Sequence, residues 1–233
     1  PDLKKINFDR DVIFTWNGTT SGVKIPDGEW ISNDRKGLTI CDATSAIFAM
    51  PIDYQKCDVI TWSWQKVLGG EAAHGMISLS PRAIERIENY TPSWPIPKIF
   101  RLKDKGKFIS GIFEGSTINT PSMICVEDAI DSLEWVESIG GLNNLISISN
   151  SSFETIYKWI KENNWVNFLA ENLEKKYLSN TSITFKITED WFVQKNEKLQ
   201  RNIMKEICKL LSENNVAFDI NGYNKAPPSF RIW

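Results

Sequence analysis

One lysine of this chain, Lys66, stands where a side-chain amine could act as a nucleophile. It lies between the aromatic segment Ile60–Trp64 and a glycine-rich turn, and the apolar segment Gly75–Leu79 follows. Burial disfavours the charged form of an amine, so a lysine in a partly dry turn can react at neutral pH. That is the chemistry of a lysine that binds a carbonyl group, including the one on pyridoxal phosphate. A surface lysine in a strand–turn–strand unit fits the same local pattern.

Two further polar residues follow predicted strands upstream of Lys66. Thr19 lies just past the β-rich run Asp11–Trp16, and Asp42 directly follows the buried-type strand Gly37–Cys41. The carboxyl ends of parallel strands meet at one rim of a sheet, and such sheets bind their ligands there. We therefore expect Thr19, Asp42 and Lys66 to share one rim.

Asp42 has the chemistry of a partner for a cationic ring. A carboxylate against a pyridine nitrogen keeps that nitrogen protonated. The protonated ring then withdraws electrons from a substrate α-carbon. The alternative role for Asp42 is the N-cap of a following helix, where Thr44 and Ser45 are additional capping candidates.

Three other features are candidates for ligand contacts. His74 could be a general acid–base group or bind a substrate anion, although a single histidine near a turn is more often a hydrogen-bonded structural residue. Gly69–Gly70 lacks the spacing of a P-loop or a dinucleotide fingerprint, so no nucleotide site is predicted. The segment Gly115–Pro121 places small donors before a helix expected to start at Pro121. That arrangement is either an anion site or an ordinary capped helix.

The composition excludes several classes of protein. The 233 residues are 42% hydrophobic and 24% charged, with a net charge of −2, which gives no sign of a nucleic-acid or membrane partner. We find no membrane-spanning run and no basic-then-apolar leader, so we expect a cytoplasmic protein. Cys41, Cys57 and Cys125 lie in apolar segments and are expected in the core, and Cys208 lies apart from them. One histidine cannot supply a multi-histidine metal site, so no metal is predicted.

Short apolar strands separated by longer connections predict an α/β architecture with a sheet covered on both faces. The predicted elements are strands at 11–16, 37–41, 58–62 and 75–79, helices at 81–88, 121–139 and 142–162, a strand at 182–187, a helix at 196–213 and a strand at 216–220. Residues 90–120 are expected to be irregular. The chain is expected to divide into domains at residues 1–145 and 146–233.

The ends of the sequence suggest a piece of a longer protein. The chain begins Pro-Asp-Leu without a methionine, and it stops in the strand-like segment Ser229–Trp233. We expect truncation at both ends.

Six motifs, in this order, resemble the phosphoserine aminotransferase family of fold-type-I pyridoxal-phosphate enzymes, and within it the branch found in many α-proteobacteria. They are Thr-Trp-Asn-Gly-Thr-Thr-Ser-Gly (15–22), Cys-Asp-Ala-Thr-Ser-Ala (41–46), Ser-Trp-Gln-Lys (63–66), Gly-Gly-Glu-Ala-Ala-His-Gly-Met (69–76), Glu-Gly-Ser-Thr-Ile-Asn-Thr-Pro-Ser (114–122) and Phe-Arg-Ile-Trp (230–233). The resemblance covers essentially the whole chain. It implies the later part of the large, cofactor-binding domain followed by most of an α+β small C-terminal domain.

The resemblance also implies roles for individual residues. Lys66 would be the Schiff-base lysine, with Asp42 at the pyridinium nitrogen, Thr19 at the phenolic oxygen and Gln65 at the phosphate of the cofactor. Asn119 and Thr120 would reach the cofactor phosphate of the neighbouring subunit in a homodimer. Arg231 would pair with the substrate α-carboxylate, and His74 would lie on the substrate side.

The resulting hypothesis is pyridoxal-phosphate-dependent amino transfer between phosphoserine with 2-oxoglutarate and 3-phosphohydroxypyruvate with glutamate, a step of serine biosynthesis. The family carries its glycine/serine phosphate loop, its ring-stacking aromatic residue and the basic residues for the substrate phosphate upstream of the matched region. Two alternatives remain open. One is another fold-type-I enzyme, either a serine–glyoxylate-type aminotransferase or a cysteine desulfurase, which needs a reactive cysteine on a mobile loop. The other is an inert fragment that only folds and dimerises.

Overall fold

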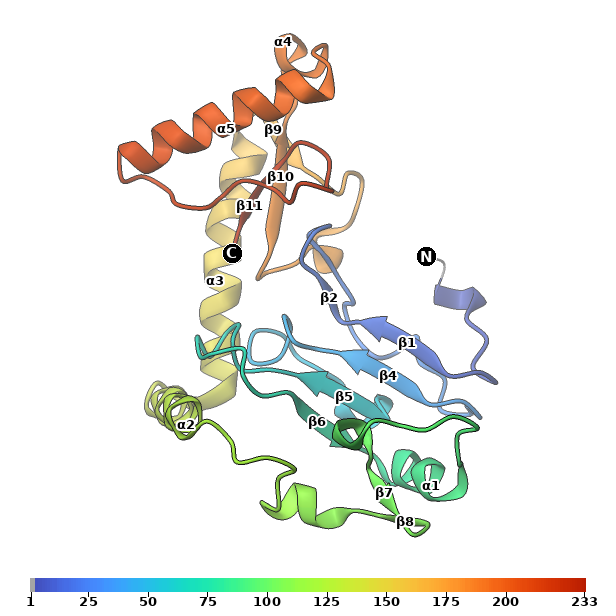
Figure 1. Cartoon of the computed structure of the whole chain (residues 1–233). Coiled ribbons are helices and arrows are strands. Elements are labelled where there is room, and N and C mark those ends of the chain that lie inside the picture. Colours follow the sequence, from blue (N-terminus) through green and yellow to red (C-terminus); the bar gives the residue numbers. More distant parts are fainter. Residues whose placement is uncertain (1–2) are drawn as a thin grey trace. The chain divides into compact units, whose positions relative to one another are not determined.

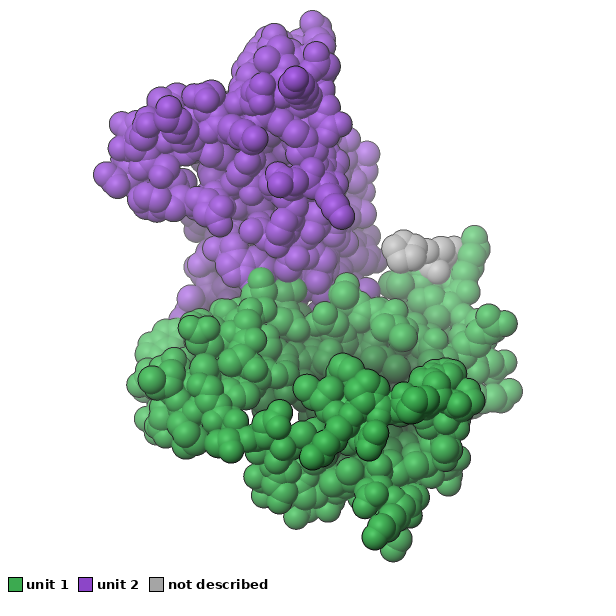
Figure 2. Space-filling view, in the orientation of Figure 1, with its two compact units in different colours: residues 1–15, 27–47, 52–139 green, residues 16–26, 48–51, 140–233 purple. Residues whose placement is uncertain are grey.

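The computed structural model describes residues 3–233, which divide into two compact units (Figure 2). Unit 1 contains the residues up to Thr15 together with Asp27–Ile47 and Ile52–Ile139, and unit 2 contains Trp16–Pro26, Phe48–Pro51 and Gly140–Trp233. Unit 2 thus takes two short segments from the first quarter of the chain. The functional division at residues 145 and 146 stays a prediction.

Unit 1 is built on a four-stranded mixed sheet (Figure 1). Its strands are, in spatial order, β1 (Val12–Thr15), β4 (Thr39–Asp42), β5 (Val59–Trp62) and β6 (Met76–Leu79). The first three are parallel to one another and β6 is antiparallel to β5. All four strands were predicted. β6 can reverse direction because its connection to β5, residues 63–75, contains no crossover helix.

In unit 1, α1 begins at a side-chain cap, and the predicted start of α2 is corrected. α1 (Pro81–Asn89) has Ser80 as its N-cap, and the Ser80 side chain accepts a hydrogen bond from the N–H of Ala83 at 3.2 Å. The prediction that the next helix starts at Pro121 is wrong, because α2 spans Met123–Ser138. Ser122 is the extended N-cap residue of α2, and its N–H donates to Nε2 of His74 at 3.2 Å.

Two short hairpins were not among the predicted elements. β2 (Asn17–Gly18) pairs with β3 (Val23–Lys24) in unit 2, and β7 (Lys103–Asp104) pairs with β8 (Lys107–Phe108) in unit 1. The second hairpin turns through Lys105 and Gly106, both at positive φ, as a two-residue hairpin turn requires. The rest of residues 90–120 contains only short 3₁₀ turns, as expected.

Unit 2 packs helices against a three-stranded antiparallel sheet. The strands, in spatial order, are β11 (Phe230–Ile232), β10 (Ile183–Ile187) and β9 (Val166–Phe168). The helices are α3 (Gly141–Glu162), α4 (Asp190–Val193) and α5 (Glu197–Glu213). The predictions for β10, α3 and α5 are confirmed within one residue at each end, and β9 was not predicted.

The predicted strand at Val216–Ile220 is wrong. These residues belong to the connection between α5 and β11, and Val216 and Phe218 are largely exposed. Asn215 and Asp219 have positive φ values, which take the backbone out of the extended region. The segment therefore forms no strand, and only Ile220 reaches the sheet, where its carbonyl accepts the N–H of Arg231 in β11.

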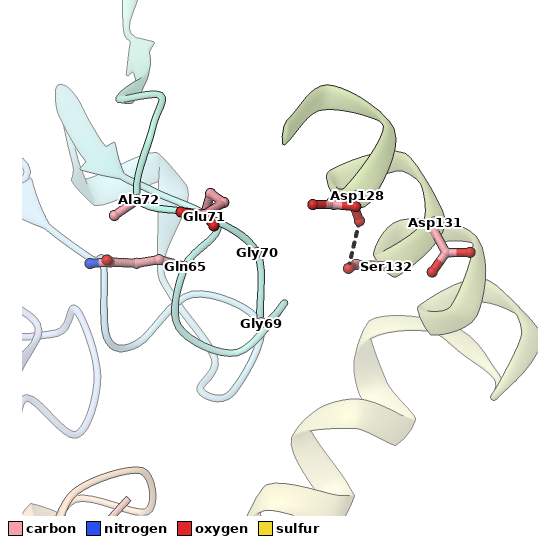
Figure 3. Close-up of a pocket in the computed structure, with 8 residues that line it drawn as sticks. All are labelled: Gln65, Gly69, Gly70, Glu71, Ala72, Asp128, Asp131 and Ser132. Carbon is pink, nitrogen blue, oxygen red and sulfur yellow. Dashed lines mark hydrogen bonds between the residues drawn. The ribbon is translucent and has the colours of Figure 1, made fainter. Parts of the chain in front are cut away.

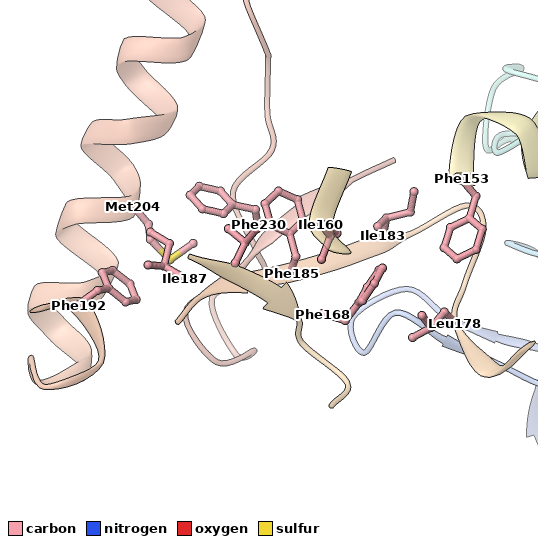
Figure 4. Packing of buried hydrophobic residues seen from close by; sticks show 11 residues of the cluster. Phe153, Ile160, Phe168, Leu178, Ile183, Phe185, Ile187, Phe192, Met204 and Phe230 are labelled. Carbon is pink, nitrogen blue, oxygen red and sulfur yellow. The ribbon is translucent and has the colours of Figure 1, made fainter. Parts of the chain in front are cut away.

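The core of unit 2 is an aromatic and aliphatic cluster around β10 (Figure 4). Phe185 of β10 lies 5.2 Å from Phe230 of β11, measured between ring centroids, and Trp159 of α3 meets the Phe185 ring edge-on. Met204 brings α5 into the same cluster. This packing fixes β11, which carries Arg231, against the rest of the unit.

A buried carboxylate ties together the amino-terminal end of the unit 1 sheet. Asp58, 1% exposed, accepts hydrogen bonds from the N–H of Thr39 at 2.9 Å, from Nε of Arg35 at 3.2 Å and from Oγ of Ser80 at 3.0 Å. Arg82 of α1 adds a contact from Nη1 to Asp58 Oδ2 at 3.2 Å. This network joins β4, β5 and α1 at the end of the sheet opposite the carboxyl ends.

Gly37 is a position where the backbone itself leaves no room for a side chain. A Cβ on Gly37 would lie 1.9 Å from the backbone oxygen of Arg10. We expect Gly37→Ala to lower the free energy of unfolding by about 1–3 kcal/mol or more, because backbone must move to relieve the overlap. Urea unfolding measures this, with Gly75→Ala as the control, since nothing lies within 4 Å of a Cβ there. Equal stability of the two variants would contradict the close approach.

No helix in the described part of the chain combines the length and the apolar character needed to cross a membrane.

Candidate active site

Asp42 and the turn containing Lys66 lie at the carboxyl ends of two neighbouring parallel strands. Asp42 is the last residue of β4 and pairs with Thr61 of β5, and Lys66 lies in the turn that follows β5 at Trp62. Because β4 and β5 are parallel, these ends lie on the same edge of the sheet. The expected shared rim is confirmed for these two strand ends.

The backbone of the Lys66 turn is held by local contacts. The N–H of Gly69 donates to the carbonyl of Lys66 at 3.0 Å, and the N–H of Gly70 donates to the carbonyl of Trp64 at 3.1 Å. Gly69 has φ +71°, which only glycine adopts without cost. Leu68 is buried, and its carbonyl accepts from Oγ of Ser132 at 2.9 Å. The half-buried Lys66 side chain thus projects from a rigid turn.

Asp42 caps a turn, and no helix follows it. Its Oδ1 accepts the N–H of Thr44 at 2.9 Å, and residues 44–49 form turns. The alternative role as a helix N-cap is therefore wrong, although the local side-chain-to-backbone bond exists. The Asp42 side chain is exposed and accessible to a ligand.

His74 and the segment before α2 contact each other. Nε2 of His74 accepts the N–H of Ser122, so the neutral ring carries its proton on Nδ1. Among the described residues, that buried Nδ1 has no hydrogen-bond partner. The His74 ring also lies 5.2 Å from the Trp64 ring. These contacts are the structural role considered for His74, and its role toward substrate stays a prediction.

The predicted anion site before α2 changes with the start of the helix. Gly115 has φ +95° and ends a 3₁₀ turn, and Asn119 and Thr120 are exposed in the segment that follows. Pro121 lies outside the helix, so it does not form its first turn. Asn119 and Thr120 remain available to a partner molecule.

A polar cavity of about 580 Å³ lies beside the Lys66 turn in unit 1 (Figure 3). Gln65, Gly69, Gly70, Glu71 and Ala72 line one side, and Asp128, Asp131 and Ser132 of α2 line the other. Three carboxylates here repel anions, so we do not place the cofactor phosphate predicted for Gln65 inside this cavity. Asp128 and Asp131 were not singled out in the sequence, although their spacing puts them on one helix face.

Two predicted site residues belong to unit 2. The carbonyl of Thr19 accepts Oγ of Ser182 at 2.6 Å. Arg231 lies in β11 with its Cζ 4.1 Å from the centroid of the Tyr223 ring. Its buried Nε has no hydrogen-bond partner among the described residues. The rest of this half-buried guanidinium presents paired N–H groups, which suit a carboxylate ligand.

Residues 5–217 match the family model of the class-V aminotransferases. The chain belongs to this family.

The relatives of this class-V aminotransferase chain are longer than it is. The chain is 56% identical over all 233 residues to a phosphoserine aminotransferase of Methanosarcina barkeri, and 53% identical to one of Methanosarcina mazei. It spans 60% of the length of each of these curated relatives.

Solved structures share the fold of the chain at low sequence identity. A phosphoserine aminotransferase from Cytophaga hutchinsonii superposes with a TM-score of 0.72 at 21% identity, over 94% of this chain and 57% of that one. A pyridoxal-phosphate-bound phosphoserine aminotransferase from Trichomonas vaginalis gives 0.70 at 17% identity, over 94% and 54%. The expected α/β fold of the fold-type-I aminotransferases is thereby confirmed.

The cysteines of the chain are mostly internal. Cys41, Cys57 and Cys125 are buried, as predicted, and Cys208 is half-buried on α5. None of the four is an exposed loop residue of the kind a desulfurase needs. Within residues 3–233, no group of three or more His, Cys, Asp or Glu side chains is placed to hold a metal ion.

Proposed function

We propose that this chain is part of a pyridoxal-phosphate-dependent phosphoserine aminotransferase of serine biosynthesis. It would transfer the amino group between L-phosphoserine with 2-oxoglutarate and 3-phosphohydroxypyruvate with glutamate. The observation that carries the proposal is where an amine and a carboxylate are placed. Asp42 ends β4, and Lys66 lies in the turn after β5, the neighbouring parallel strand. The names of the two relatives above 50% identity support the substrate.

The residues at the rim fit the proposed cofactor. Lys66 would hold it covalently through Nζ, and the exposed Asp42 carboxylate would pair with its ring nitrogen. Thr19 would bond the phenolic oxygen, and Gln65 would contact the phosphate from outside the acidic cavity. When bound, pyridoxal phosphate supplies an electron sink for the bond broken at the substrate α-carbon.

The remaining residues would position the substrate and move its proton. Arg231 would bind the α-carboxylate with its guanidinium edge, and His74 would lie on the substrate side. Nζ of Lys66, once free, would take the proton from the substrate α-carbon and return it to the cofactor carbon. The Asp42 carboxylate would face the ring nitrogen and favour its protonated form.

We also propose that the enzyme is a cytoplasmic homodimer. Asn119 and Thr120 are exposed before α2 and would reach the cofactor phosphate of the neighbouring subunit. Size measurement of the native enzyme tests the dimer. Mixing an Asn119→Ala enzyme with a Lys66→Ala enzyme tests whether these residues serve the partner's site.

The direct test of the function is a coupled assay of the native enzyme with phosphoserine and 2-oxoglutarate. Glutamate and the phosphorylated oxo acid should appear in equal amounts. Glyoxylate as the preferred amino acceptor would instead favour a serine–glyoxylate-type enzyme. A second test measures the absorbance of the 233-residue chain alone with pyridoxal phosphate, before and after borohydride. A band that borohydride fixes shows that these residues suffice to hold the cofactor, and no band favours the inert fragment.

Asp42→Asn is expected to lower kcat by about 10²–10³-fold, because an amide cannot hold the ring nitrogen in its cationic form. The amide oxygen can still accept the N–H of Thr44, so folding should be retained. Steady-state kinetics measure the loss, with Asp128→Asn on α2 as the matched control. Comparable kcat values for the two variants would rule out the role of Asp42.

A further inference from the structure

Tyr223 lies against the residue proposed to bind the substrate carboxylate. Its ring lies under the Arg231 guanidinium, with 4.1 Å between the ring centroid and Cζ. Stacking on an aromatic face leaves the in-plane N–H groups of an arginine free to donate. The ring therefore restricts the guanidinium to one plane and leaves its edge for a ligand.

The loop that carries Tyr223 is closed on itself and on α5. The N–H of Gly222 donates to the carbonyl of Ser229 at 2.8 Å, and the N–H of Ala226 donates to the carbonyl of Tyr223 at 2.9 Å. Arg201 of α5 donates from Nη2 to the carbonyl of the buried Ala226 at 2.6 Å. Tyr223 is thus held by backbone contacts that do not involve its own hydroxyl.

Glycine is required at position 222 for this closure. A Cβ there would lie 2.6 Å from the carbonyl oxygen of Ser229. A backbone hydrogen bond also fixes the strand at Arg231, whose N–H donates to the carbonyl of Ile220 at 2.8 Å. Both sides of the stack, ring and guanidinium, therefore come from constrained backbone.

The guanidinium itself is only partly used by the protein. Its Nε is buried and has no hydrogen-bond partner within residues 3–233. Because Nε itself is enclosed by the protein, a ligand would meet the two terminal Nη groups of this half-buried side chain. A planar carboxylate accepts from two N–H groups at once, which matches this edge.

We infer that Tyr223 is a positioning residue that orients Arg231 for the α-carboxylate of the amino-acid substrate. The inference rests on the proposed function, and it makes Tyr223 a residue that sets the selectivity of the enzyme for ligands with an α-carboxylate. Tyr223 acts through Arg231 and need not touch the substrate.

The test compares ligands that differ only in the α-carboxylate, with the native holoenzyme. The pairs are L-phosphoserine with phosphoethanolamine, and L-glutamate with 4-aminobutyrate. In Tyr223→Leu, we expect phosphoserine and glutamate to bind about tenfold more weakly, as loss of a partly desolvated cation–π contact implies, with kcat within about twofold. Binding of the two amines without an α-carboxylate should not change.

Two further variants separate positioning from general packing. Tyr223→Phe keeps the ring and should restore the affinity for the α-amino acids. Phe218→Leu replaces a 64% exposed aromatic residue of the same connection and should leave the affinity for all four ligands unchanged. Tyr223→Leu in an Arg231→Gln background should add no further loss.

The failures of the two proposals are distinguishable. If the wild-type enzyme transaminates glutamate and not phosphoserine, the proposed substrate is wrong. The comparison of L-glutamate with 4-aminobutyrate still tests whether Tyr223 positions Arg231. If Tyr223→Leu weakens both members of a pair alike, or neither, the positioning role is overturned. A wild-type enzyme that binds both members of each pair equally would overturn both the Arg231 role and this inference.

Discussion

Lys66→Ala is expected to reduce transamination by about 10⁴-fold or more, the scale seen when a covalent catalytic group is removed. The variant loses both the covalent attachment point for the cofactor and the base that moves the substrate proton. Because the turn is held by the backbone bonds of Gly69 and Gly70 and by buried Leu68, the fold should survive the change.

Borohydride treatment of the native enzyme is the decisive measurement for Lys66. Reduction makes the bond between lysine and cofactor permanent, and peptide mass mapping then finds the modified residue. The label should sit on Lys66 in the wild type and be absent from Lys66→Ala. Lys107→Ala, at an exposed lysine of β8, should leave labelling and turnover intact. A labelled Lys66→Ala enzyme would place the cofactor on another lysine.

Asp58→Ala is expected to have the largest effect on stability. It removes the acceptor for Arg35 and Arg82, and the side chain of Arg35 is only 8% exposed. Breaking a buried ion pair from one side costs about 3–5 kcal/mol, because the remaining charge is left uncompensated. Urea unfolding measures this loss. Asp9→Ala removes an ion pair with Lys36 that is 66% and 82% exposed, and should cost at most about 1 kcal/mol.

The same residue makes stability depend on pH. Burial by itself raises the pKa of Asp58, but the hydrogen bonds from Thr39, Arg35 and Ser80 outweigh it and hold the pKa below its ordinary value. The contribution of Asp58 is therefore complete above the pKa of the unfolded chain, about 3.9. It is lost as the pH falls through the lower pKa of the folded protein. In Asp58→Ala, the free energy of unfolding should fall less steeply at low pH than in the wild type. The same low-pH dependence in both proteins would contradict the role of Asp58.

The elements that could be predicted are those encoded by neighbouring residues. β4 and β5 are short apolar runs bounded by turn-forming residues, and their order gave the rim that Asp42 and Lys66 share. α1 and α5 have a side-chain cap at Ser80 and Asn196. In each case the determining interactions lie within a few positions along the chain.

The errors arise where distant residues decide the local structure. α2 begins two residues later than predicted, and Ser122, the residue before it, donates its N–H to His74, 48 positions earlier. Val216–Ile220 has the composition of a strand, but the positive φ values at Asn215 and Asp219 interrupt its extended backbone, and only its end reaches β11, through the carbonyl of Ile220. The acidic cavity likewise needs α2 opposite the turn at Glu71, and no local pattern places it there.

The way the two units share the chain has a consequence for how the protein folds and breaks. The chain passes from one unit to the other after Thr15, Pro26, Ile47, Pro51 and Ile139. Late residues of unit 2 bind its early segments, since the N–H of Ser179 donates to the carbonyl of Gly22 and Nδ2 of Asn180 donates to the carbonyl of Ala49.

Unit 2 cannot be completed during synthesis until more than a hundred further residues have followed its first segments, so its assembly depends on slow, long-range contacts. A single proteolytic cut at Gly140 would also fail to yield two whole units. Each product would carry part of unit 2, and the hairpin with Thr19 would remain on the product that contains Lys66.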